Sequence, residues 1–411
     1  MLGTAAVVVV AAVAAAAVCT LAQTWGARTS TAEARAADAG ANGAGAAGAG
    51  AAGAGVAGAA AAGMQAHQPS TAGEQVLRVV AMTPSVGARR VDGAGSIEVG
   101  FSAPLAADSP TPALSPRVSG QWHQIGAAMV FTPDIGFAPS TRVTVRVPAG
   151  PTGVRSAAGA LLARPLVSHF STKPYSLMRL SEILSQLGYL PLSWAPDASW
   201  HLVGQAGRPG ARLAAQIAMA YSPPAGKFHW DKGYPPVLRS QWRPGGPNLL
   251  VTGAVMAFES QHGMQSDGLA SRAVWAALFA AADHGRDNRA GYTYALATKA
   301  APETLTIWHD GKIVLQSLAN TGIPVAPTAD GTFPVYLRYR FQIMTGVNPD
   351  GSRYADPVSF VAYFNGGDAV HYFPRGSYGF EQSLGCLELP LSSAARAWPY
   401  LTYGSLVTVV G

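Results

Sequence analysis

The chain has 411 residues, a formal net charge of +6 and only 12% charged residues. A chain of this length is expected to form about two to four domains, each able to bury a core of its own. The small positive net charge would favour binding to an anionic surface, but a charge of this size is equally typical of proteins whose surface charge serves only solubility. Lys and Arg form no cluster of the kind that binds nucleic acid, so the composition argues against a nucleic-acid-binding protein.

Residues 1–26 predict export. The run from Leu2 to Ala22 is apolar apart from one glycine and two threonines, and about twenty such residues can span a bilayer. The first arginine is Arg28, so no basic flank indicates the orientation. A signal peptide cut near Ala22 and an uncleaved membrane anchor both remain open. A lipid-modified Cys19 fits less well, because Val18 precedes it where a small residue is usual.

Residues 27–73 are rich in alanine and glycine and contain few large apolar side chains. Such a segment cannot bury enough surface to offset the entropy lost on ordering, so it predicts a flexible tether. This tether is expected to act as a spacer that holds the folded part of the chain away from the membrane.

Residues 74–173 predict a β-sandwich. Short alternating runs occur at 96–101, 128–131 and 141–147, and turn-forming residues separate them. Four phrases resemble the bacterial immunoglobulin-like (Big) family: Thr83-Pro-Ser-Val-Gly87, Phe101-Ser-Ala-Pro-Leu105, Val130-Phe-Thr-Pro133 and His169-Phe-Ser-Thr172. The resemblance implies a domain that spaces and positions its neighbours, and no catalytic group is expected here.

Residues 174–285 predict helices. The phrase 177–187 places Leu177, Leu180, Ile183, Leu184 and Leu187 on one face, and Gly188 offers a stop. Ser271 is expected to cap a last helix whose apolar stripe is Val274, Trp275 and Leu278. Leu-Gly-Tyr-Leu at 187–190 and Ala-Phe-Glu-Ser-Gln-His-Gly at 257–263 resemble the peptidoglycan-binding domain type 1, a small three-helix module.

An insertion at 193–247 departs from that compact family form. Its tryptophans are interpreted as core and loop anchors, with stacking on sugars as the less favoured alternative: Trp194, Trp200, Trp230 and Trp242. His262 and Asp267 are too weak a pair to indicate a metal, so they are interpreted as surface polar residues.

Residues 290–411 return to a β pattern. Two alternating runs over 303–317 flank Asp310-Gly311, a strong hairpin signal. Further strands are expected at 358–364 and 369–371, and a last strand at 406–410 is expected to close the sheet.

Cys386 is the candidate nucleophile of this region. The chain has two cysteines, and Cys19 lies in the apolar N-terminal run, so an exported protein has one cysteine in its folded part. Gly385 precedes it, which allows close backbone approach and directs an N–H group at a substrate oxygen. His371, upstream, is a candidate to take the thiol proton. A buried inert thiol remains the alternative.

The same residues resemble the L,D-transpeptidase (YkuD) catalytic domain, in which a histidine precedes the block Ser/Thr-His-Gly-Cys. His371 matches the upstream histidine, and Ser383-Leu384-Gly385-Cys386 matches the block. Leu384 replaces the family's second histidine, and Glu388 stands where Asn or Arg is common.

The resemblance implies a set of roles. Cys386 is the expected nucleophile, His371 the general acid/base, and Gly385 a backbone donor to the oxyanion. Ser383 is expected to orient the loop, with a simple turn residue as the alternative. The expected substrate contacts are Tyr363, Tyr372 and Arg375, and neither a metal nor another cofactor is required.

The chain is therefore expected to be multidomain and mostly β, with an Ig-like sandwich, a small helical peptidoglycan-binding module and a C-terminal L,D-transpeptidase domain. The implied activity is cleavage of the bond between residues 3 and 4 of a stem tetrapeptide, with release of D-Ala and transfer of the acyl group to an amine of a second stem. Water or a D-amino acid as acceptor, and a non-catalytic wall-binding protein, remain alternatives. Expected partners are peptidoglycan stem peptides and glycan, at the cell wall or the outer face of the plasma membrane.

Overall fold

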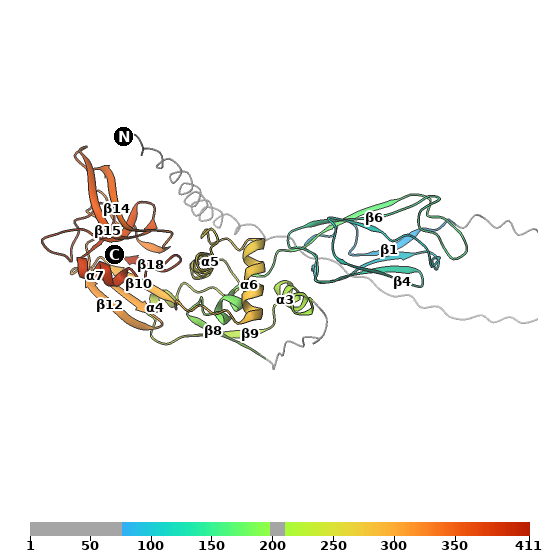
Figure 1. Cartoon of the computed structure of the whole chain (residues 1–411), viewed down its shortest axis with the longest axis horizontal. Coiled ribbons are helices and arrows are strands. Elements are labelled where there is room, and N and C mark those ends of the chain that lie inside the picture. Colours follow the sequence, from blue (N-terminus) through green and yellow to red (C-terminus); the bar gives the residue numbers. More distant parts are fainter. Residues whose placement is uncertain (1–75, 198–209) are drawn as a thin grey trace, which may run out of the picture. The chain divides into compact units, whose positions relative to one another are not determined.

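The structure is a computed structural model that describes residues 76–197 and 210–411 (Figure 1). The predicted export segment 1–26, the predicted tether 27–73 and Trp200 lie outside the described residues. None of the described helices is both long and apolar enough to cross a membrane.

The first described part is a two-sheet β-sandwich, as the sequence predicts. One antiparallel sheet has the order β1 (Val79–Thr83), β2 (Ile97–Phe101), β5 (Ala128–Pro133) and β4 (Gly120–Ile125). The other has the order β3 (Ala113–Ser115), β6 (Arg142–Val147) and β7 (Leu166–Ser171). Alternation buries one face of β2, β5, β6 and β7, as Val143, Val145 and Val147 show on β6.

The middle part contains five helices within the described residues. They are α2 (Leu177–Gln186), α3 (Ala211–Tyr221), α4 (Pro236–Arg239), α5 (Leu249–Gln261) and α6 (Arg272–His284). Ser271 Oγ accepts from the Val274 N–H at 3.3 Å, which confirms the predicted cap of α6. Gly188, with φ +74°, follows the end of α2 as expected. Leu177, expected on the apolar face of α2, is 38% exposed, whereas Arg179 and Glu182 on the same helix are buried.

The Trp-rich insertion belongs to the same core as the flanking helices. It contributes α3 and a two-stranded ribbon of β8 (Leu192–Pro196) and β9 (Gly226–Trp230). Trp230 and Trp242 pack against the helical core, which confirms their interpretation as anchors. A short three-helix module with a separate insertion is therefore too simple a description.

The C-terminal part is built from two sheets. The first has the order β12 (Lys312–Leu318), β11 (Thr304–His309), β10 (Thr293–Thr298), β18 (Leu406–Val410) and β13 (Gly331–Pro334). The second has the order β14 (Leu337–Val347), β15 (Arg353–Asn365), β16 (Asp368–Tyr372) and β17 (Leu387–Leu389). Helix α7 (Leu391–Ala397) follows β17, and a shared core joins residues of both sheets.

Two expectations for these sheets are confirmed and one element was missed. Asp310 and Gly311 both have positive φ at the β11–β12 turn, and β18 joins the first sheet beside β10. The long hairpin of β14 and β15 was not predicted beyond 358–364 (Figure 1). Residues 337–347 do alternate, but Phe341, Ile343 and Val347 are exposed, so burial does not organise this strand.

Replacing Ile307 with Ala is expected to destabilise the C-terminal part by about 2–5 kcal/mol, because its fully buried side chain leaves a cavity between the sheets. Ile313, on the neighbouring strand, is 52% exposed and provides the matched control. Urea unfolding of both Ile→Ala variants measures the difference; equal losses would contradict the assignment of the core.

Candidate active site

The pairing of β16 with β17 brings the predicted catalytic residues together. The two strands run parallel, with Val370 opposite Leu387 and His371 opposite Glu388. Cys386 directly precedes β17, two residues before Glu388. Because side chains alternate along a strand, Cys386 and Glu388 face the same side as His371. A histidine and a cysteine separated by a long loop thus come to one face of one sheet.

The imidazole of His371 is buried and neutral. The side chain is 3% exposed, and Nδ1 lies 3.0 Å from the carbonyl oxygen of Tyr372. A carbonyl only accepts, so Nδ1 carries the proton and Nε2 is the free base. Burial lowers the pKa of His371, and the Tyr372 carbonyl and the Glu388 carboxylate oppose that shift. The ring is therefore available to accept a proton through Nε2.

The thiol of Cys386 is protonated in the resting site. Its Sγ donates to the carbonyl of Gly367 at 3.7 Å. Burial raises the pKa of Cys386 to about 12; the Ala369 N–H lowers it, and Asp368 and Glu388 raise it further. No hydrogen bond joins Cys386 to His371 in the described part of the chain. The thiolate must consequently form during the reaction, when the proton passes to His371.

Ser383 holds the nucleophile loop. Its hydroxyl donates to the Cys386 carbonyl at 2.7 Å and accepts from the Gly385 N–H at 3.2 Å, and the side chain is 1% exposed. These bonds match the expected orienting role. In this state the Gly385 N–H donates to Ser383, and its expected role toward a substrate oxygen stays a prediction.

Gly385 is required by the backbone itself. Its φ is +112°, in the region that favours glycine, and a Cβ built there would lie 2.5 Å from Asp368 Oδ1. The glycine of the motif therefore allows β16 and the nucleophile loop to approach closely.

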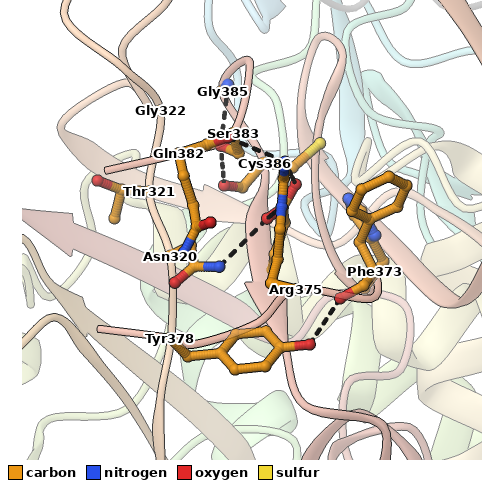
Figure 2. Close-up of polar contacts among 12 residues, drawn as sticks. Asn320, Thr321, Gly322, Phe373, Arg375, Tyr378, Gln382, Ser383, Gly385 and Cys386 are labelled. Carbon is orange, nitrogen blue, oxygen red and sulfur yellow. Dashed lines mark hydrogen bonds and ion pairs between the residues drawn. The ribbon is translucent and has the colours of Figure 1, made fainter. Parts of the chain in front are cut away.

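Arg375 forms an ion pair with Glu388. Its Nε and Nη2 donate to the two carboxylate oxygens of Glu388, each at 2.8 Å, and Nη2 also donates to the Gln382 carbonyl at 2.9 Å. Asn320 Nδ2 donates to the same carboxylate at 3.3 Å. Figure 2 shows these contacts, with the sulfur of Cys386 pointing away from Ser383. The guanidinium of Arg375 thus stabilises the loop between His371 and Cys386, and the substrate contact expected of it stays a prediction.

The two predicted tyrosines have different positions. Tyr363 lies near Cys386: burial and then the charge of Cys386 raise its pKa to about 12, and its hydroxyl donates to Gln342 at 3.1 Å. Tyr372 instead packs its ring against the core between the sheets, because it alternates with His371 along β16. This packing does not favour a substrate contact through the Tyr372 ring, and the Tyr372 carbonyl orients His371.

Two supporting residues, Glu303 and Asn320, were not found from the sequence. Glu303, 1% exposed, accepts from the Thr321 N–H at 2.6 Å and from the Thr321 hydroxyl at 2.7 Å. Asn320 Oδ1 accepts from the Gly379 N–H at 3.0 Å. The first contact joins the residue before β11 to the segment after β12, and the second joins that segment to the loop after β16. No local pattern predicts such long-range partners.

One family model matches the chain. Residues 74–172 match the family model of a bacterial Ig-like domain. A search of curated proteins finds no match.

Among solved structures, the chain is similar to L,D-transpeptidases. An L,D-transpeptidase from Mycobacterium smegmatis is 14% identical, with 82% of this chain and 99% of that chain covered and a TM-score of 0.28. L,D-transpeptidase 3 from Mycobacterium tuberculosis is 14% identical, with 81% and 98% covered and a TM-score of 0.28. The catalytic domain from E. faecium L,D-transpeptidase is 25% identical, with 30% and 100% covered and a TM-score of 0.27. At TM-scores this low, the function has to be inferred from the site.

Alkylation of Cys386 by iodoacetamide is expected to be slow at neutral pH. With a pKa of about 12, its rate should rise roughly tenfold per pH unit up to about pH 10, whereas a free cysteine levels off near its pKa of about 8.5. Peptide mapping separates Cys386 from Cys19. A plateau at neutral pH would show a preformed thiolate and contradict the protonated resting site.

Proposed function

We propose that the protein is an exported peptidoglycan L,D-transpeptidase. One observation carries the proposal: the β16–β17 pairing places a buried neutral imidazole and a cysteine thiol on one face, with the nucleophile loop held by Ser383. Acyl transfer through a cysteine needs a thiol and a base in one site, and these are the two groups that the pairing brings to one face.

The proposed reaction begins with proton transfer from Cys386 to Nε2 of His371. The sulfur attacks the carbonyl carbon of the amide between residues 3 and 4 of a stem tetrapeptide. His371 then returns the proton to the departing D-alanine amine, which leaves a thioester on Cys386. An amine of a second stem attacks the thioester, forms the 3–3 cross-link and releases the thiol. Gly385 can serve the oxyanion only if its N–H leaves Ser383 Oγ during the reaction.

The remaining parts fit the same substrate. The Ig-like domain is proposed to space the catalytic domain from its attachment, and the helical part 174–285 to bind the wall polymer. Residues 2–22 are proposed to direct export or to anchor the chain, so that it acts in the cell wall or at the outer face of the membrane.

A second candidate is a non-catalytic wall-binding protein. The raised thiol pKa and the lack of a hydrogen bond between the described His371 and Cys386 favour it. Hydrolysis of the same acyl-enzyme, which would make the protein an L,D-carboxypeptidase, uses the same site.

Incubation of the purified full-length protein with disaccharide-tetrapeptide is expected to yield a dimer that has lost one D-alanine, detected by mass spectrometry. Cys386→Ala, which removes the nucleophile, is expected to yield none. Tripeptide alone would assign a carboxypeptidase, and an unchanged tetrapeptide would support the wall-binding alternative.

The pH dependence of D-alanine release tests the role of His371. The reaction needs the neutral ring, so activity should fall as pH drops through the pKa of His371. Because burial lowers that pKa from 6.5, the acid-side inflection of kcat/KM is expected below pH 6.5. An inflection above this value would contradict a buried neutral base.

A further inference from the structure

The second sheet of the C-terminal part ends in a long, uncharged edge. β14 pairs with β15 on one side, and within the described residues its other side has no neighbouring strand. An edge strand directs every second N–H and C=O group away from its sheet, and proteins commonly protect such an edge with charged residues, proline or a bulge. The stretch from Phe341 to Val347 contains no charged residue and no proline, and its register with β15 is unbroken.

The other sheet edges of the C-terminal part are short or covered. β17 has three residues, and its central residue Glu388 exchanges two backbone hydrogen bonds with Asn320, at 3.0 and 3.1 Å. β13 has four residues. On β12, the carbonyl of Val314 accepts from Arg396 of α7 at 3.0 Å. The long open edge of β14 is therefore an exception in this part of the chain.

Large apolar side chains line the outer face of the same hairpin, which extends beyond the rest of the C-terminal part (Figure 1). Phe341, Ile343 and Val347 form this outer strip and are 62%, 55% and 59% exposed. The opposite face packs inward, because Met344 lies in the cluster that contains Cys386. The catalytic site accounts for the inner face only, and adjoining exposed apolar groups are typical of an interaction surface.

The charges of the hairpin favour a second copy of the chain as the partner of this edge. Arg340 is exposed at the base of β14, and Asp350 is exposed in the turn that follows the strand. When two copies of β14 pair antiparallel, the base of each strand lies beside the turn of the other, which brings opposite charges together. Parallel pairing sets Arg340 beside Arg340 and is disfavoured. Arg353 lies on β15, one strand away from the edge.

We propose that two copies of the chain pair antiparallel through β14, so that their second sheets form one continuous sheet. The same surface then serves both copies, as a two-fold axis requires. With Met344 at this axis, Phe341 of each copy lies opposite Val347 of the other, and Ile343 lies opposite Thr345. Aromatic and β-branched side chains in such opposite positions stabilise paired strands. The dimer is independent of the proposed activity.

Sedimentation velocity of the purified full-length protein, over about a hundredfold range of concentration, measures the association. The wild type is expected to shift from monomer to dimer as its concentration rises. Ile343→Lys brings an ammonium group from each copy into the middle of the paired strands and is expected to raise the dissociation constant about tenfold or more. Phe341→Lys repeats the measurement if Ile343→Lys does not fold.

Ile313→Lys is the matched control. Ile313 is 52% exposed and lies on β12, the edge strand that Arg396 covers, so the same substitution is made at similar exposure on another edge. It is expected to leave the dissociation constant unchanged. Association through the apolar run Leu2–Ala22 is the same in every variant and so cannot produce a difference between them.

Disulfide trapping tests the direction of the pairing. In a background with Cys19→Ser and Cys386→Ala, Phe341→Cys protein is mixed with Val347→Cys protein and oxidised. The mixed disulfide is expected, because opposite residues of antiparallel strands lie within disulfide reach. Its absence, or a disulfide between two copies of Phe341→Cys, overturns the antiparallel pairing.

The remaining outcomes concern the interface itself. A wild type that stays monomeric at every concentration overturns the second copy as the partner and leaves the edge to an extended peptide of another protein. A dimer that Ile343→Lys and Ile313→Lys weaken equally, or that both leave intact, overturns β14 as the interface.

Discussion

The parallel pairing of β16 with β17 is the constraint on which the site depends. It sets His371 opposite Glu388 and leaves Cys386 at the entry to β17, on the same face. Parallel strands need a connection that crosses from the end of one to the start of the other, and here that connection is the loop 373–386. The backbone hydrogen bonds between β16 and β17 therefore position His371 and Cys386, and the loop only connects the end of β16 to the start of β17.

Buried polar contacts hold that loop in one conformation. The carboxylate of Glu388 is 4% exposed and is satisfied by Arg375 and Asn320, so its charge is compensated. Ser383 bridges Gly385 and Cys386 from within the loop. Glu388 stands where the resembled family commonly has Asn or Arg. In this chain its carboxylate pairs with Arg375 and so helps to hold the loop. Leu384, which replaces the motif histidine, is 36% exposed and makes no comparable contact among the described residues.

Local signals predicted much of the fold and only part of the site. Alternation identified the strands of the sandwich and the β11–β12 hairpin, because burial of one face leaves a period of two in the sequence. His371, Ser383 and Cys386 were found because a short motif carries them. Tyr372 and Arg375 were assigned to the substrate, but strand alternation turns one toward the core and a partner thirteen residues away engages the other. Asn320 and Glu303 act through partners distant in sequence, which no local pattern contains.

The most direct measurement is the location of the covalent intermediate. The full-length protein is mixed with disaccharide-tetrapeptide, quenched in acid and digested, and its peptides are mapped by mass spectrometry. The account predicts a disaccharide-tripeptide thioester on Cys386 in the wild type, and far less of it in His371→Gln, which lacks the base. An adduct on another residue, or none at any reaction time, would contradict cysteine-based acyl transfer at this site.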